Sequence, residues 1–131
     1  MTPPDPLASL AEDWLRGVAA AGFVPGVRAR ARAALRDLLE EFVAAVRAEP
    51  FDPAPGARIG AELVDLRMSA PPVIGTTVHL LAGRLPAVLG DDTRPRVLDL
   101  LDRLATGFAA AQRDAAVRAA EEMNRSEKIH W

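Results

Sequence analysis

His79 is the first residue to weigh for chemistry, because the only other histidine, His130, is the penultimate residue of the chain. A histidine can hold a haem iron or a metal ion when its imidazole enters an apolar pocket. At about 100° per residue, His79 falls opposite the apolar stripe of its own segment and beside Gly75, Ala82 and Gly83. We therefore expect no haem, other cofactor or metal ion here. We expect these four residues to form a small-residue face that another helix can approach closely; the alternative is a pair of glycines that the helix tolerates without a contact.

Other residues with reactive side chains lack the spacing of an active site. The chain of 131 residues contains no cysteine, which excludes disulfides, thiolate metal sites and cysteine nucleophiles. Carboxylates such as those of Glu40 and Glu41 are adjacent in sequence. Adjacent residues of a helix point in different directions, so they do not suggest a general acid–base pair. The sequence predicts no catalytic residue, and we expect that this chain is not an enzyme.

Three large aromatic residues, Trp14, Phe42 and Phe108, fall on apolar helical stripes. Packing in a hydrophobic core is the simpler interpretation. The alternative is a small-molecule pocket between helices, which such side chains would line. No polar residues converge on them in the sequence to favour the pocket.

The charge balance bears on the kind of partner. Charged residues make up 26% of the chain and the formal net charge is −2, whereas a general nucleic-acid-binding domain is usually basic. Arg28, Arg32 and Arg36 lie four residues apart, but no interleaved aromatic residue could stack on bases. No apolar run approaches the roughly 18 residues of a transmembrane helix, and no signal peptide opens the chain. We expect no nucleic acid, no membrane span and a cytoplasmic location.

The elements that carry these residues are expected to be helices, because apolar residues recur at helical spacing and no segment alternates with period two. Proline, glycine and capping residues mark their ends. The first expected helix runs from Pro6, capped by Asp5, to Gly22, and the second from Pro25 or Gly26 to the proline-rich turn 49–56. The third runs from Ala57 to Met68. The fourth begins after a Ser69 cap and kinks or ends at Pro86, and the fifth begins after a Thr93 cap and covers residues 94–125. The expected fold is an all-α bundle of about five helices.

The last of these segments organises the chain. Apolar residues recur there at spacings of 4, 3, 4, 3 and 4, as in a heptad seam, at Val97, Leu101, Leu104, Phe108, Ala111 and Ala115. A helix over residues 94–125 would be about 48 Å long. Its first half can join the core, whereas its Ala-rich, charged second half must leave the core or pair with a copy of itself. We expect a homodimer through this connector seam, stabilised partly by the face of Gly75, Ala82 and Gly83.

Three segments and the C-terminal tail resemble known protein families. Phe23-Val24-Pro25, the turn Ala48 to Pro53 and the segment Ile59 to Val64 resemble the N-terminal region of multidomain signalling proteins of high-GC Gram-positive bacteria. Those proteins carry GGDEF and EAL domains, which make and degrade cyclic di-GMP. The tail Asn124 to Trp131 resembles the entry into a PAS domain.

The resemblance implies a non-catalytic N-terminal input or dimerisation domain over residues 1–125, with residues 126–131 starting a linker into downstream domains of the same chain. Neither the GGDEF nor the EAL signature occurs in the sequence, so no catalytic residue is carried over. The resemblance also favours a dimer, because GGDEF enzymes need two protomers to assemble a productive site.

A second resemblance gives an alternative interpretation of the chain. An all-helical domain with a long last helix is similar to globin-like sensor domains of stress-signalling proteins, and this would imply a small-molecule or haem-type sensor. A visible absorption spectrum of the purified protein distinguishes the two interpretations.

Overall fold

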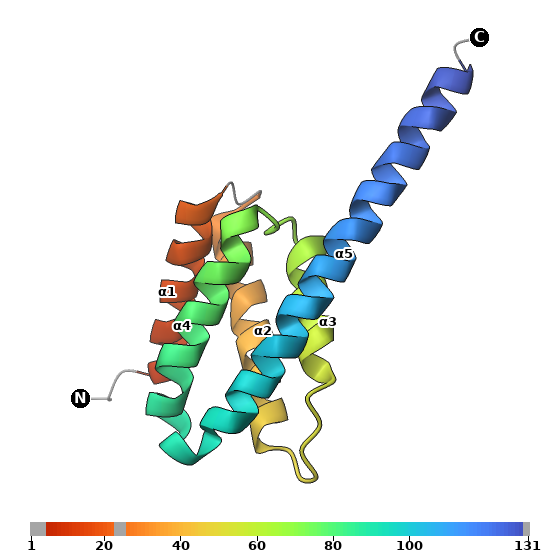
Figure 1. Ribbon diagram of the computed structural model, residues 1–131. Coiled ribbons are helices and arrows are strands. Elements are labelled where there is room, and N and C mark those ends of the chain that lie inside the picture. The colour runs from red at the N-terminus through yellow and green to blue at the C-terminus, as the bar shows by residue number, and fades with distance from the viewer. Residues whose placement is uncertain (1–4, 23–25, 130–131) are drawn as a thin grey trace.

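The chain folds as an all-α bundle, as the sequence predicts (Figure 1). The computed structural model describes residues 5–22 and 26–129, and it contains no strand within these ranges. Five α-helices and one short 3₁₀ helix follow each other along the chain. They are α1 (Pro6–Ala21), α2 (Arg28–Arg47), α3 (Pro55–Asp65), α4 (Pro71–Leu89), η1 (Asp91–Thr93) and α5 (Arg94–Ile129).

The five α-helices close a ring around one core. Around this ring, α1 packs against α2, α2 against α3, α3 against α5, α5 against α4, and α4 back against α1. Figure 1 shows α5 running along the bundle and then continuing well beyond it. The described chain therefore consists of a compact bundle and a projecting helix.

Local signals account for the start and end of α1. The side chain of Asp5 accepts a hydrogen bond of 3.0 Å from the backbone N–H of Leu7, which satisfies one of the free donors of the first turn. Pro6 is the first helical residue, where its missing N–H costs nothing. Gly22 follows the last residue. These three predicted positions are confirmed. The connector Phe23-Val24-Pro25 lies outside the described residues.

The junction between α3 and α4 differs from the prediction. Helix α3 ends at Asp65 rather than at Met68, because Arg67 takes the left-handed conformation with φ of 62°. The N–H of Met68 then donates to the carbonyl of Leu63, and that of Arg67 to Val64, each at 2.9 Å. This is a Schellman-type end of a helix. The expected Ser69 cap is wrong, since the residue before α4 is Ala70 and no side chain caps that helix.

The fourth helix does not end at Pro86, which was one of the two outcomes predicted there. Helix α4 continues through Pro86 to Leu89, although proline usually kinks or ends a helix. Pro86 is buried, so its ring packs within the bundle, and the helix ends instead at Gly90, where φ is 117°. Thr93 precedes α5 as predicted, but its hydroxyl donates to the carbonyl of Gly90 at 2.6 Å.

One hydrophobic core holds the bundle together. Its largest fully buried side chains come from all five helices and include Trp14, Leu35, Phe42, Ile59, Leu81 and Leu100. The one buried polar side chain among the described residues, Thr77, accepts a 2.9 Å hydrogen bond from the indole N–H of Trp14. This bond satisfies the polar end of the largest aromatic residue inside the core and joins α1 to α4.

Candidate functional site

The outgoing half of α5 is the most distinctive feature of the structure. Along the first half of the helix, Val97, Leu100, Leu104 and Phe108 are at most 2% exposed. Every residue from 116 to 126 is exposed, and that segment includes Val117 at 52% and Met123 at 67% exposure. Residues 116–129 add about 21 Å of helix beyond the bundle at 1.5 Å per residue. A helix that starts in a core and projects from it can carry movement of the bundle to another molecule or domain.

The heptad seam is divided between the two halves. The structure places Leu101, Leu104 and Phe108 in the core of one chain. Ala111 and Ala115 are half-buried and lie where the helix leaves the bundle. The three large residues are therefore covered within a single copy and do not offer a surface to a second one. The predicted seam can pair with a copy only beyond Phe108, where it consists of alanines.

Arg96 anchors the start of α5, and the sequence analysis overlooked it. One guanidinium nitrogen, Nη1, donates to the carbonyls of Val46 and Ala48 at 3.0 and 3.1 Å, and Nη2 pairs with Glu49 at 2.7 Å. The guanidinium lies 5.0 Å from the centroid of the Phe51 ring, within the range of a cation–π interaction. Arg96 thus binds carbonyls that the end of α2 leaves free and ties the 49–56 turn to α5.

Three glycines bring α3 and α5 into backbone contact. A Cβ added at Gly56 would overlap the carbonyl of Leu100, one at Gly60 would overlap that of Leu104, and one at Gly107 would overlap that of Ala57. The spacing of four between Gly56 and Gly60 is a sequence signal for close helix packing, which the sequence analysis did not use. The base of the projecting helix is held rigidly by this contact.

The predicted small-residue face lies on the surface of α4. Gly75, His79 and Gly83 are exposed and Ala82 is half-buried. No heavy atom outside the neighbouring backbone lies within 4 Å of a Cβ added at Gly75 or Gly83. The position of His79 away from the buried face agrees with the predicted helix phase, while the absence of haem stays a prediction. Within residues 5–22 and 26–129, no helix covers the exposed part of this face, at Gly75, His79 and Gly83.

The aromatic residues proposed for a pocket belong to the core. Trp14 and Phe42 are 0% exposed and Phe108 is 2% exposed. The surface hollows that the structure shows lie elsewhere. One of about 240 Å³ between α2 and α3 is lined by Asp37, Glu41, Arg58 and Glu62 among others. There, Arg58 and Glu41 pair at 2.7 Å. In the described ranges, no group of three or more histidine and acidic residues is arranged to hold a metal ion.

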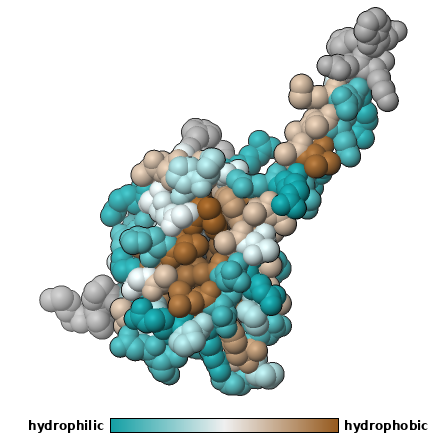
Figure 2. Space-filling model, viewed as in Figure 1, coloured by the Kyte–Doolittle hydropathy of each residue, from teal (hydrophilic) through white to brown (hydrophobic). Residues whose placement is uncertain are grey.

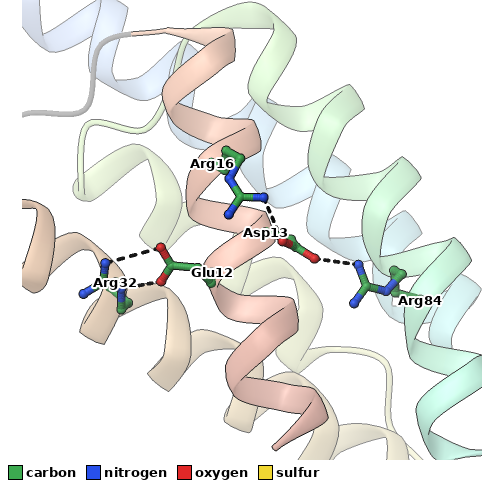
Figure 3. Close-up of polar contacts among 5 residues, drawn as sticks. All are labelled: Glu12, Asp13, Arg16, Arg32 and Arg84. Atoms are coloured by element: carbon green, nitrogen blue, oxygen red, sulfur yellow. Dashed lines mark hydrogen bonds and ion pairs between the residues drawn. The ribbon is translucent and has the colours of Figure 1, made fainter. Parts of the chain in front are cut away.

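Ion pairs link α1 to its two neighbours (Figure 3). Arg84 of α4 donates to Asp13 at 2.8 Å, and Arg32 of α2 pairs with Glu12. These hydrogen bonds lower the pKa of Asp13 and of Glu12, with partial burial acting in the opposite direction. Both carboxylates are therefore charged near neutral pH, and their role is to hold helices together.

Asp5, the N-terminal cap of α1, also holds helices together through an ion pair. Arg36 binds Asp5 at 2.9 Å and Glu40 at 3.0 Å, and the bond from Arg36 is the main cause of the lowered pKa of Asp5. Two arginines of the predicted basic cluster, Arg32 and Arg36, are thus engaged with carboxylates of α1 and α2.

One helix in the described ranges, α4, is long and apolar enough to cross a membrane, by length and composition alone. Its sequence is not an uninterrupted apolar run, because His79 and Arg84 lie within it. Core helices of soluble proteins meet the same criterion, and α4 buries Val73, Thr77 and Leu81 in the bundle.

The expected boundary after residue 125 falls inside α5, which continues to Ile129. Residues 130 and 131 of the predicted linker lie outside the described part of the chain. No family model, no curated protein and no solved structure matches the sequence or the fold.

Proposed function

We propose that this chain is a non-catalytic input and dimerisation domain, and that α5 passes the state of the bundle to an effector module. The observation that carries the proposal is the course of α5. Its first half is part of the core, whereas residues 116–126 are exposed on all sides. A stiff helix anchored in this way converts a small rotation in the bundle into a displacement at its far end.

The anchoring of α5 supports this role. Arg96 fixes the start of the helix to the end of α2, and Gly60 allows its middle to touch the backbone of α3. A change in the packing of α2 or α3 therefore moves α5 as one body. The structure offers no comparable route through the other helix ends that it describes.

For the effector, we propose a diguanylate cyclase or cyclic di-GMP phosphodiesterase of a bacterial signalling protein, with a homodimer as the working form. This part rests on the resemblance of the Ala48–Pro53 turn and of the Ile59–Val64 segment to GGDEF and EAL proteins. The comparisons with known proteins add no support for it. The projecting helix is compatible with it, because GGDEF catalysis depends on how two protomers are brought together.

A fusion protein tests the proposal. The chain is joined through α5 to a GGDEF domain that is inactive as a monomer, and the rate of cyclic di-GMP synthesis is measured. We expect the fusion to be active and the isolated GGDEF domain to be inactive. The control fusion carries Phe42→Ala, which weakens the bundle but leaves the sequence of α5 unchanged, and its rate should fall. Equal rates for the fusion and the isolated GGDEF domain would contradict the proposal.

The haem-type sensor remains a separate prediction with its own test. No hollow described above is lined by His79 or by the core aromatic residues. We expect no Soret band when the protein is mixed with haemin. A Soret band that is lost in His79→Ala would contradict this prediction.

A further inference from the structure

We propose that one continuous surface, formed by the outer sides of α4 and α5, binds a second copy of this chain. The inference rests on the proposed function, which requires a homodimer, and it names the surface that forms it. We call this surface the α4–α5 face. It consists of Ile74, Val78 and Ala82 of α4, with Gly75, His79 and Gly83 at its edge, and of Leu98, Ala105, Ala109, Ala116 and Met123 of α5.

The α5 part of the face is a second heptad row, separate from the predicted seam. Together with Gln112 and Ala119, its residues recur at spacings of 7, 4, 3, 4, 3 and 4 from Leu98 to Met123. The amide of Gln112 donates to the carbonyl of Ser69 at 2.6 Å, and Ser69 lies just before α4. The row therefore runs along the side of α5 that turns toward α4, while α3 covers the side with Gly107.

The α4 part of the face lies against this row. Ile74, Val78 and Ala82 recur every four residues and are only half-buried against the core. Figure 2 shows apolar surface gathered in the middle of the bundle, where Figure 1 places α4 beside α5. Leu98 is 50% exposed and Met123 is 67% exposed. A patch of this kind, extending over two helices, is unusual on a monomeric protein and typical of an interaction site.

The charges of the face fit a second copy. A two-fold interface places the same surface on both sides, so a patch of one charge would repel itself. The one charged residue of α4, Arg84, is bonded to Asp13 of α1, which leaves the outer side of α4 without charge. On α5, Asp102 occupies the position of the row between Leu98 and Ala105, and Arg113 borders the row with the opposite charge, so this part of the face carries no excess of one sign. Depletion of charge at the centre is typical of protein interfaces.

The area of the α4–α5 face indicates whether α5 alone or α4 and α5 together could form a dimer interface. A strip about 10 Å wide covers about 390 Å² along residues 98–123 of α5 and about 150 Å² along residues 74–83 of α4. Stable interfaces bury about 800 Å² on each partner. Helix α5 alone supplies about half of this area, whereas α4 and α5 together supply about two thirds of it. A lipid surface fits less well, because helices that lie on membranes carry a basic border, and α4 has only Arg84.

Sedimentation equilibrium of this chain over a range of micromolar concentrations tests the proposal. We expect a dimer whose dissociation constant rises tenfold or more in Ala109→Glu and in Gly83→Glu. Both residues are exposed within one chain, so these variants should keep the helical circular dichroism signal. The matched control is Ala44→Glu, at an exposed alanine of α2, and its dissociation constant should not change. Since the chain has no cysteine, Ala109→Cys should also cross-link with a bismaleimide, and Ala44→Cys should not.

Three results would overturn the proposal. A dimer that is weakened by Ala115→Glu, but not by Ala109→Glu or Gly83→Glu, would move the interface to the predicted seam and leave the proposed function standing. A chain that stays monomeric at every concentration would remove both the face and the dimerisation role. A monomer that sediments with anionic lipid vesicles, and no longer does so in Ala109→Glu, would assign the face to a membrane surface.

Discussion

The backbone contact between α3 and α5 predicts that the same substitution has opposite effects at two glycines. Glycine in the middle of a helix is about 1 kcal/mol less favourable than alanine, so propensity alone predicts that Gly60→Ala and Gly83→Ala are both stabilising. At Gly83 no atom stands in the way of the new methyl group. At Gly60 the methyl group would overlap the carbonyl of Leu104 and lie 2.8 Å from the amide nitrogen of Phe108.

Backbone atoms cannot rotate away as a side chain can, so the two helices must separate. Overpacking of this kind costs about 1–3 kcal/mol, and we take the upper end here because the obstacle is backbone on both sides of the new atom. After the gain in propensity, Gly60→Ala should lose about 2 kcal/mol of unfolding free energy. Gly83→Ala should gain up to about 1 kcal/mol.

Urea unfolding followed by far-UV circular dichroism measures both effects. With a slope of about 2 kcal/mol per molar urea, the midpoint should fall by about 1 M for Gly60→Ala and rise for Gly83→Ala. The measurement is made at a concentration low enough to keep the chain monomeric, because Gly83 also belongs to the α4–α5 face. A Gly60→Ala protein as stable as the parent would refute the close packing of α3 and α5.

Three further predictions follow from the contacts described above. Phe42→Ala should lose about 3–5 kcal/mol in the same urea assay, because a fully buried aromatic side chain is removed. Arg96→Met should lose about 1–3 kcal/mol, since it frees the carbonyls at the end of α2, and Arg96→Lys should not restore the loss because lysine cannot reproduce the planar fork. The arginine partners of Asp5, Glu12 and Asp13 lower the pKa values of these carboxyl groups from ordinary values of 3.8 or 4.5. The ion pairs therefore stabilise the folded state above about pH 4.5, and this stabilisation is lost as the pH falls. Acid titrations should show a weaker pH dependence when all three are changed to the corresponding amides.

The boundaries of the fold could be predicted where a few neighbouring residues decide them. Asp5 with Pro6 starts α1, and Gly22 ends it, because the cap bonds span only two to four residues. The course of α4 through Pro86 could not be predicted this way, since what makes the proline tolerable is its burial among other helices. The end of α3 at a left-handed Arg67 carries no glycine signal and was missed for that reason.

In the candidate site, too, features set by local sequence could be predicted and features set by tertiary packing could not. The heptad pattern located α5 and its buried first half, because periodicity records which side of a helix faces apolar surroundings. The pattern did not show that Phe108 is covered within one chain and therefore closed to a second copy. Asp5 lies 31 residues from its partner Arg36, and Val46 lies 50 residues from Arg96, and no local spacing indicates such pairs. Only the fold brings them together.

Rotating the projecting part of α5 tests the central claim most directly. In the GGDEF fusion, seven helix-forming residues inserted after Arg118 extend the helix by nearly two full turns, whereas five residues rotate its far end by about 140°. We predict that the seven-residue insertion keeps the rate of cyclic di-GMP synthesis close to that of the parent fusion and that the five-residue insertion changes it severalfold. Equal rates for the two insertions would show that α5 is a passive tether and would contradict the account.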